Sequence, residues 1–233
     1  MSTAALPSPT KYRYKPGGGI AVTTIVLLVL SMTFQLGILA GELVMLTGAL
    51  NRDIEQADAG LVISALAVIG QVLTVTIPLI VFFCIWTHRV AANVRALGAS
   101  GLRHSPGWAV GWFFIPVANL FMPFSVFREI DRASQPTGYV DTEAWKRNAP
   151  GVVITFWWLT WFLQTIIGGV GNILTKRFPP EMGPAVTAGV MCDVAASFLL
   201  LGCGVFAILM IRRIDRLQIQ AWQARALHAP PIA

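Results

Sequence analysis

Charged residues and cysteine are both scarce in this sequence of 233 residues. Asp, Glu, Lys and Arg together make up 12% of it, about half the usual share in a soluble domain, which argues against an ordinary globular enzyme. Three cysteines in a chain of this length exclude a disulfide scaffold. Hydrophobic residues reach 55%, which excludes disorder for most of the chain. An integral membrane protein is the class that remains.

Sequence motifs for catalysis and metal binding are also missing. The chain contains no G-x-S-x-G, no Walker loop and no G-x-G-x-x-G. His88, His104 and His228 lack the spacing of metal ligands, and the cysteines lack a C-x-x-C pair. We therefore expect a non-enzymatic protein without a metal and without a cofactor.

Four apolar stretches are long enough to cross a bilayer, because about 20 helical residues span its core of roughly 30 Å. They cover residues 20–50, 61–86, 151–172 and 185–211. Helices are expected because a strand would leave backbone groups unpaired in lipid. The first stretch is too long for the apolar core of a cleaved signal peptide. The sequence thus predicts an all-α integral membrane protein with four transmembrane helices, forming a single membrane domain over residues 1–233.

Lys and Arg lie mainly on one side of these predicted spans. The N-terminal tail holds three, the loop 87–150 holds seven and the C-terminal tail holds four, whereas the two short connections hold three in all. This bias places both termini and the long loop in the cytoplasm. Because the basic residues flank span ends instead of forming one patch, they predict contact with anionic membrane lipid and not with nucleic acid.

The loop segment 105–127, SPGWAVGWFFIPVANLFMPFSVF, is apolar enough to suggest a fifth span. Pro116 and Pro123 interrupt a helix there, with Asn119 between them. A fifth crossing would also divide Lys and Arg almost evenly between the two sides. We therefore expect a re-entrant or interfacial helical element on the cytoplasmic side. Before it, the second span should continue as a helix to a cap near Gly98, and residues 125–134 should form another helix.

The residues around this segment resemble a known family. The motif comprises Trp86, Arg89, Asn93, Leu97-Gly98, Ser105-Pro106-Gly107-Trp108-Ala109-Val110-Gly111-Trp112, Ile115-Pro116, Asn119-Leu120, Pro123, Arg128-Glu129 and Arg132-Ala133-Ser134. In this run the chain resembles bacterial membrane proteins catalogued as domain of unknown function 4328. The resemblance implies a bacterial multi-pass protein, and with the charge bias it implies the inner membrane. It implies no activity.

Ten motif residues define a hypothetical surface for binding a partner protein or a lipid. They are Trp86, Arg89, Asn93, Trp108, Trp112, Pro116, Asn119, Pro123, Arg128 and Arg132. The partner would be another membrane protein, a second copy of the chain, or lipid. The tryptophans have two further interpretations. They form an aromatic belt at the inner interface, or Trp108, Trp112 and Trp158 line a stacking pocket for a lipid or quinone-like ring.

Polar residues inside the predicted spans favour a second hypothesis, a small transporter or channel. Polar side chains are unfavourable in lipid and usually face the interior of a helix bundle. Here they are Gln35, Glu42, Gln164 and Asp193, of which the two carboxylates would form a proton or cation site. In the alternative interpretation both carboxylates reach the outer interface. Gly37-x-x-x-Gly41 allows close helix packing, either with a second copy or within the chain.

Overall fold

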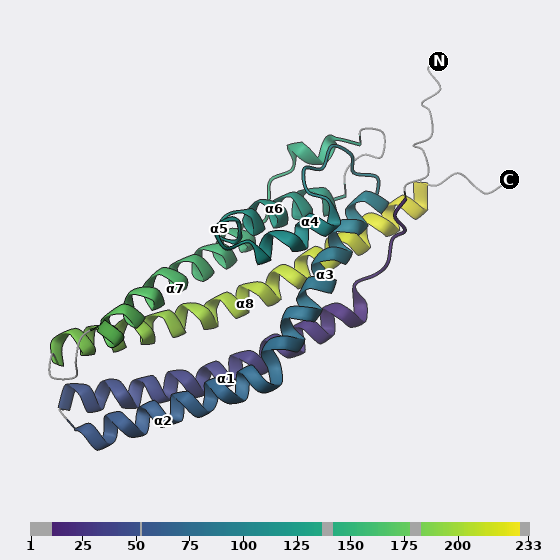
Figure 1. Cartoon of the computed structure of the whole chain (residues 1–233). Coiled ribbons are helices and arrows are strands. Elements are labelled where there is room, and N and C mark those ends of the chain that lie inside the picture. The colour runs from purple at the N-terminus through teal and green to yellow at the C-terminus, as the bar shows by residue number, and fades with distance from the viewer. Residues whose placement is uncertain (1–10, 52, 137–141, 178–182, 229–233) are drawn as a thin grey trace, which may run out of the picture. The chain divides into compact units, whose positions relative to one another are not determined.

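The computed structural model describes residues 11–51, 53–136, 142–177 and 183–228, and every regular element in these ranges is a helix (Figure 1). The elements are α1 (Gly18–Asn51), α2 (Ile54–Gln71), the π-helical turn η1 (Val72–Thr76), α3 (Ile77–Ala96), α4 (Pro106–Gly111), the 3-10 turn η2 (Trp112–Phe114), α5 (Pro116–Asn119), α6 (Met122–Ser134), the 3-10 turn η3 (Ala144–Arg147), α7 (Val152–Arg177) and α8 (Gly183–His228).

Four helical stretches in the described part of the chain are long and apolar enough to cross a membrane. They are Gly18–Asn51, Ile54–Ala96, Val152–Lys176 and Gly183–Ala226, the second being the continuous run of α2, η1 and α3. The four predicted spans and the all-α class are therefore confirmed. The helices extend beyond the apolar stretches because polar residues continue the same turns. At the end of α3, Gly98 adopts a φ of 92°, the left-handed conformation expected of a glycine cap.

Segment 105–127 is divided into short helices and forms no fifth spanning helix. Ile115 is extended, with φ −102° and ψ 111°, and Pro116 then begins α5. Pro123 stands at the start of α6 in the same way. Proline suits the first turn of a helix, where its missing N–H has no partner to lose. The longest helix here, α6, has 13 residues, which is short of the roughly 20 that a span requires.

Contacts divide the described residues into two compact units. The first, which we call the loop unit, combines residues 11–24, 81–155 and 209–228. The second, the bundle unit, combines residues 25–80 and 156–208. The single membrane domain expected from the sequence stays a prediction.

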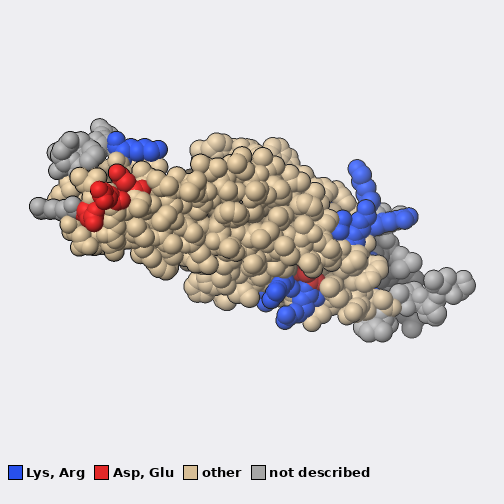
Figure 2. Space-filling view, turned by 90° about the horizontal axis from the view of Figure 1, so that it is seen from below, with Lys and Arg blue, Asp and Glu red and all other residues tan. Residues whose placement is uncertain are grey.

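Small residues let the helices of the bundle unit pack closely in antiparallel pairs. A Cβ atom on Gly41 would lie 2.6 Å from the carbonyl oxygen of Gly60, so the backbones of α1 and α2 touch there. Gly168 of α7 faces Ala196 of α8 in the same manner. The Gly37-x-x-x-Gly41 pair thus serves packing within the chain. Figure 2 shows broad tan regions on the face in view, which carry no Lys, Arg, Asp or Glu side chains.

In the loop unit, the ends of α3 and α8 run side by side in parallel. The indole Nε1 of Trp86 donates to Asp215 Oδ1 at 3.2 Å, and one turn further Gln218 Nε2 donates to the carbonyl oxygen of Val90 at 3.0 Å. From the first contact to the second, the residue number rises on α3 and on α8 alike, so the two helix ends are parallel. The ring of Phe127 from α6 stacks on Trp86 with centroids 5.8 Å apart and closes the core of this unit.

Candidate functional site

A chain of buried side-chain hydrogen bonds joins three helices of the loop unit. Asn93 and Gln218 are only 1% and 2% exposed. Asn93 Nδ2 donates to Gln218 Oε1 at 2.9 Å, and Gln218 Nε2 donates to Ser134 Oγ at 3.1 Å. Reversing either amide would set like groups against each other, so the contacts fix the orientation of both. The motif residue Asn93 is therefore held rigidly between α3, α8 and α6.

A buried ion pair ties the same unit together at Asp131. This side chain is fully buried, and its Oδ1 accepts a hydrogen bond from Arg213 Nε at 2.7 Å. Its Oδ2 accepts the backbone N–H of Gly151, also at 2.7 Å. Paired and hydrogen-bonded on both oxygens, the carboxylate meets the conditions under which a buried charge is stable. It connects α6, the residue before α7, and α8.

Glu129 holds the chain segment that leads into α4. Its two carboxylate oxygens accept the backbone N–H groups of Arg103 and His104 at 2.8 and 3.1 Å. The residue that follows His104, Ser105, caps α4 through a hydrogen bond from the backbone N–H of Trp108 to its Oγ. The start of the Pro/Trp-rich segment is therefore fixed by polar contacts within the loop unit.

His104 links this segment to α6 in its neutral form. Trp112 Nε1 donates to His104 Nδ1 at 3.3 Å, and because an indole only donates, this nitrogen must be unprotonated. The other ring nitrogen lies 3.3 Å from Ser125 Oγ. Burial lowers the pKa of His104 below its ordinary value, Glu129 raises it, and the positive charges of Arg103 and Arg95 lower it further. The net effect favours the neutral ring that the Trp112 contact requires.

We expect the protein to lose stability as the pH falls below about 6.5, the ordinary pKa of histidine. The unfolded chain takes up a proton there, whereas His104 in the folded chain takes it up only at a lower pH. The loss therefore grows until the pH is below the folded pKa and then levels off. Thermal unfolding of the full chain in detergent at pH 5 to 8, beside a His104→Gln variant, measures it. An equally steep pH dependence in the variant would exclude His104 as the cause.

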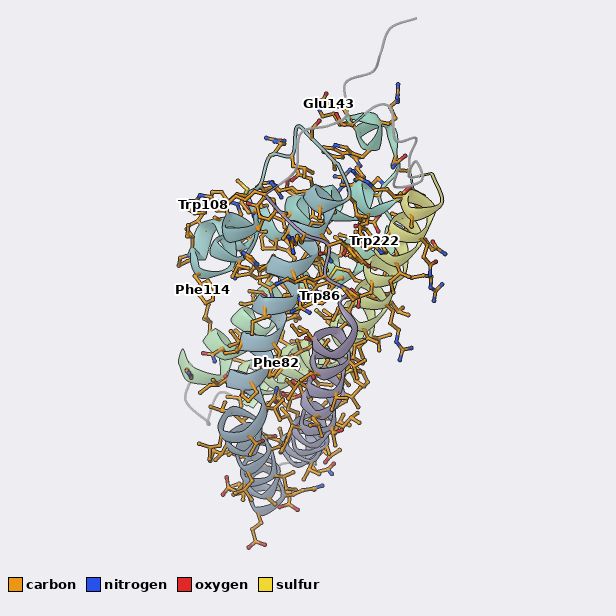
Figure 3. The ribbon with its side chains drawn as sticks, turned by 90° about the vertical axis from the view of Figure 1, so that its right-hand side faces the viewer. Phe82, Trp86, Trp108, Phe114, Glu143 and Trp222 are labelled. Atoms are coloured by element: carbon orange, nitrogen blue, oxygen red, sulfur yellow. The ribbon has the colours of Figure 1, made fainter. Side chains whose placement is uncertain are left out.

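Five large apolar side chains are exposed in the stretch from α4 to the residue before α6. They are Trp108, Phe114, Ile115, Val117 and Phe121, with exposed fractions of 53%, 65%, 39%, 73% and 55%. Figure 3 shows Trp108 and Phe114 on the same outer side of the loop unit. We call residues 106–121 the interface segment. Its inner side is fixed by the contacts of Ser105 and Trp112, so the exposed side chains belong to an ordered element.

The structure separates the ten residues of the hypothetical binding surface into an interior group and an outer group. Trp86, Asn93 and Pro123 are buried, and Trp112 and Asn119 are half-buried, whereas Trp108 and Pro116 are exposed. The three arginines also differ. Arg89 donates to the carbonyl oxygen of Pro16, Arg128 lies over the ring of Phe124, and Arg132 Nε is buried without a hydrogen-bond partner among the described residues.

Sequence reasoning missed the polar partners that these motif residues use. Asp131, Gln218 and Arg213 carry the buried contacts of the loop unit but were not singled out. A signal existed for Asp131, because it is an acidic residue on the same helix as the motif residues Arg128 and Arg132. Gln218 and Arg213 lie beyond the last apolar stretch, where nothing in the pattern distinguishes a buried polar residue from a solvated one.

In the bundle unit, the four polar residues of the transport hypothesis have different surroundings. Gln35 Nε2 donates to Ser197 Oγ at 2.9 Å, and one carboxylate oxygen of Glu42 is buried without a hydrogen-bond partner among the described residues. Asp193 lies against the backbone of Gly171. Gln164 bonds to Thr165 on its own helix. Trp158, the third member of the proposed aromatic pocket, stacks on Phe162 in this unit.

The helices and their apolar surfaces define an all-α multi-pass membrane protein. The family described as a domain of unknown function, DUF4328, matches residues 49–216, and the chain belongs to this family. The matched range includes the whole motif from Trp86 to Ser134, which confirms the resemblance seen in the sequence. No curated protein and no solved structure matches the chain. Within the described residues, no three His, Cys, Asp or Glu side chains are grouped so that they could hold a metal ion.

Proposed function

We propose that this protein is a non-enzymatic module of the bacterial inner membrane that binds lipid at the cytoplasmic interface through its interface segment. The observation that carries the proposal is the exposure of five large apolar side chains on an ordered, broken helical element. Exposed apolar patches of this kind mark contacts with a membrane or a partner. Short helices with one apolar side lie in the interface, with that side about 5–10 Å into the headgroup boundary.

The composition of the loop unit supports its placement on one side of the membrane. Residues 11–24, the end of α3, the interface segment and the end of α8 belong to one compact unit. The unit thus combines residues before the first span with residues that follow the second span and the fourth span. These segments can lie on the same side of the membrane only if the chain crosses it an even number of times between them. The excess of Lys and Arg in the same segments favours the cytoplasmic side. Both termini and the loop would then face anionic lipid headgroups.

Lipid is favoured over a protein partner because of where the exposed side chains occur in the sequence. The interface segment contains no charged residue between Pro106 and Phe121, and its polar groups are few. Interfaces between proteins usually have a polar, solvated rim around their apolar centre. A segment without charged residues, flanked by Arg103 and Arg128, is typical of an amphipathic membrane anchor. The two basic residues would then lie near lipid phosphate groups.

Spin labels at two positions of the loop unit test this proposal. In a background with the three native cysteines replaced by alanine, labels are placed at Val117→Cys and, as a control, at Ile219→Cys on α8. Ile219 is also exposed, at 41%, but lies outside the interface segment. In nanodiscs containing phosphatidylglycerol, we expect the label at 117 to be reached by oxygen more than by a water-soluble nickel chelate. The label at 219 should show the reverse.

The same experiment separates lipid from the other possible environments. If the nickel chelate reached the label at 117 as readily as the exposed label at 219, the proposal would be overturned, because the interface segment would then be in water. A label at 117 that neither reagent reaches would also overturn it, because a protein would then cover the segment.

A further inference from the structure

Residues 11–17 pack between the ends of α3 and α8 as an irregular N-terminal segment (Figure 1). Lys11, Arg13 and Lys15 are exposed, whereas Tyr12 and Tyr14 between them are half-buried. This alternation is typical of an extended chain, in which successive side chains point to opposite sides. The segment therefore has an aromatic inner side and a basic outer side.

The inner side contacts both helices through its two tyrosines. The ring of Tyr14 stacks on Trp222 of α8, with centroids 4.7 Å apart and an interplanar angle of 12°. The guanidinium of Arg95 on α3 lies 5.9 Å from the centroid of the Tyr12 ring. Each contact uses a flat ring on a flat or delocalised partner, which is favourable without a fixed hydrogen-bond direction.

The main chain of the segment is held by motif residues of α3. The side chain of Asn93 accepts the N–H of Lys15 at 3.0 Å and donates to the carbonyl oxygen of the same residue at 2.8 Å. Arg89 Nη1 donates to the carbonyl oxygen of Pro16 at 3.3 Å. These bonds are the ones that a neighbouring β-strand would supply, and they read the peptide backbone instead of the lysine side chain.

The contacts of Asn93 within the helices hold its amide in the orientation that binding of Lys15 requires. One N–H of its amide is already used by Gln218, which α6 and α3 hold in turn through Ser134 and the carbonyl oxygen of Val90. The remaining N–H and the Oδ1 atom then point to the position of Lys15. Without a backbone in that place both groups would have to exchange these two bonds for bonds to water.

The residues of α3 that hold the segment match the family, whereas the segment itself does not. Arg89 and Asn93 lie inside the residues that match DUF4328, whereas residues 11–17 lie outside them. Gly17 and Gly18 join the segment to α1. A Cβ on Gly17 would lie 2.5 Å from Asp215 Oδ1, and Gly18 has a φ of 22°, so this connection depends on glycine. The chain therefore passes close to Asp215 where the segment meets α1.

We propose that the surface formed by the ends of α3 and α8, occupied here by residues 11–17 of the same chain, is a binding site for an extended peptide. An external protein segment with the same alternation of basic and aromatic residues would bind there in its place. The tether gives the resident segment a local concentration in the millimolar range, so it prevails until its own contacts are weakened or a competitor is abundant. This site goes beyond lipid binding by the interface segment.

A labelled peptide of residues 11–17, KYRYKPG, tests the site on the full chain in phosphatidylcholine nanodiscs, which carry no net charge to attract the peptide. A Tyr12→Ala/Tyr14→Ala variant weakens the contacts of the resident segment and leaves the residues of α3 and α8 unchanged. We expect this variant to bind the peptide at least about tenfold more tightly than the unchanged chain, measured by fluorescence anisotropy.

The matched control is the same peptide with an ester in place of the amide at the position of Lys15. It keeps every side chain and charge but lacks the N–H that Asn93 accepts, so we expect about tenfold weaker binding. Asn93→Leu in the double variant should also abolish binding, and the ester comparison remains decisive if that protein does not fold. Equal binding of ester and amide peptides, or no binding of either by the double variant, would overturn the proposal.

Discussion

Replacing Gly60 with alanine is expected to destabilise the protein by about 2 kcal/mol, within the usual range of roughly 1–3 kcal/mol for overfilling a packed site. The added methyl group would meet the backbone nitrogen of Met45 and the carbonyl oxygen of Gly41, both on α1. Backbone atoms cannot rotate away as a flexible side chain can, so α1 and α2 would have to separate. Thermal unfolding and denaturant titration of the full chain in detergent measure the loss.

The same substitution at Gly169 provides the control. This glycine is also inside an apolar helix, α7, but an added Cβ there meets no atom within 4 Å. Alanine favours helix over glycine by roughly 1 kcal/mol, so Gly169→Ala should leave stability unchanged or raise it slightly. Equal effects of the two substitutions would show that the close approach of α1 and α2 at Gly60 does not limit stability.

Replacing Asp131 with alanine should cost about 3 kcal/mol, at the low end of the range for breaking a buried ion pair. The substitution removes the partner of Arg213 and of the Gly151 N–H at once. The low end applies because Asp131 is fully buried but the Arg213 side chain is 38% exposed and regains some hydration. Unfolding of the full chain with and without the substitution gives the difference.

An exposed ion pair of the same length in the same unit is the reference for this effect. Lys146 and Glu143 are also 2.7 Å apart, but their side chains are 46% and 52% exposed. Pairs in water contribute at most about 1 kcal/mol, so Glu143→Ala should change stability far less than Asp131→Ala. Similar losses for both would mean that burial of Asp131 adds nothing to the pair.

The parts of the fold that depend on local pattern could be predicted from the sequence. Continuous apolar stretches predicted the four spans, because lipid requires a helix wherever the chain crosses it. Pro116 and Pro123 predicted a break between 105 and 127, and Gly98 predicted the end of α3. Each of these features follows from residues that are neighbours in the chain.

The contacts of the candidate site could not be predicted in the same way. Asn93 bonds to Lys15 and Gln218, which lie 78 and 125 positions away in the sequence. Periodicity can place Asn93 on one helical face, but it cannot show which backbone that face meets. The N-terminal segment had only its basic charge as a signal, which pointed to lipid and gave no indication that its main chain packs against α3.

The π-helical turn at Val72–Thr76 lets one continuous helical run hold an additional residue. Its hydrogen bonds reach from residue i to residue i+5 instead of residue i+4, so the wider turn takes up the extra position. Removing one residue from this turn would return the run to regular α geometry while the helix stays continuous. Of all places in this run, the π turn is therefore where the loss of one residue disturbs the surrounding helix least.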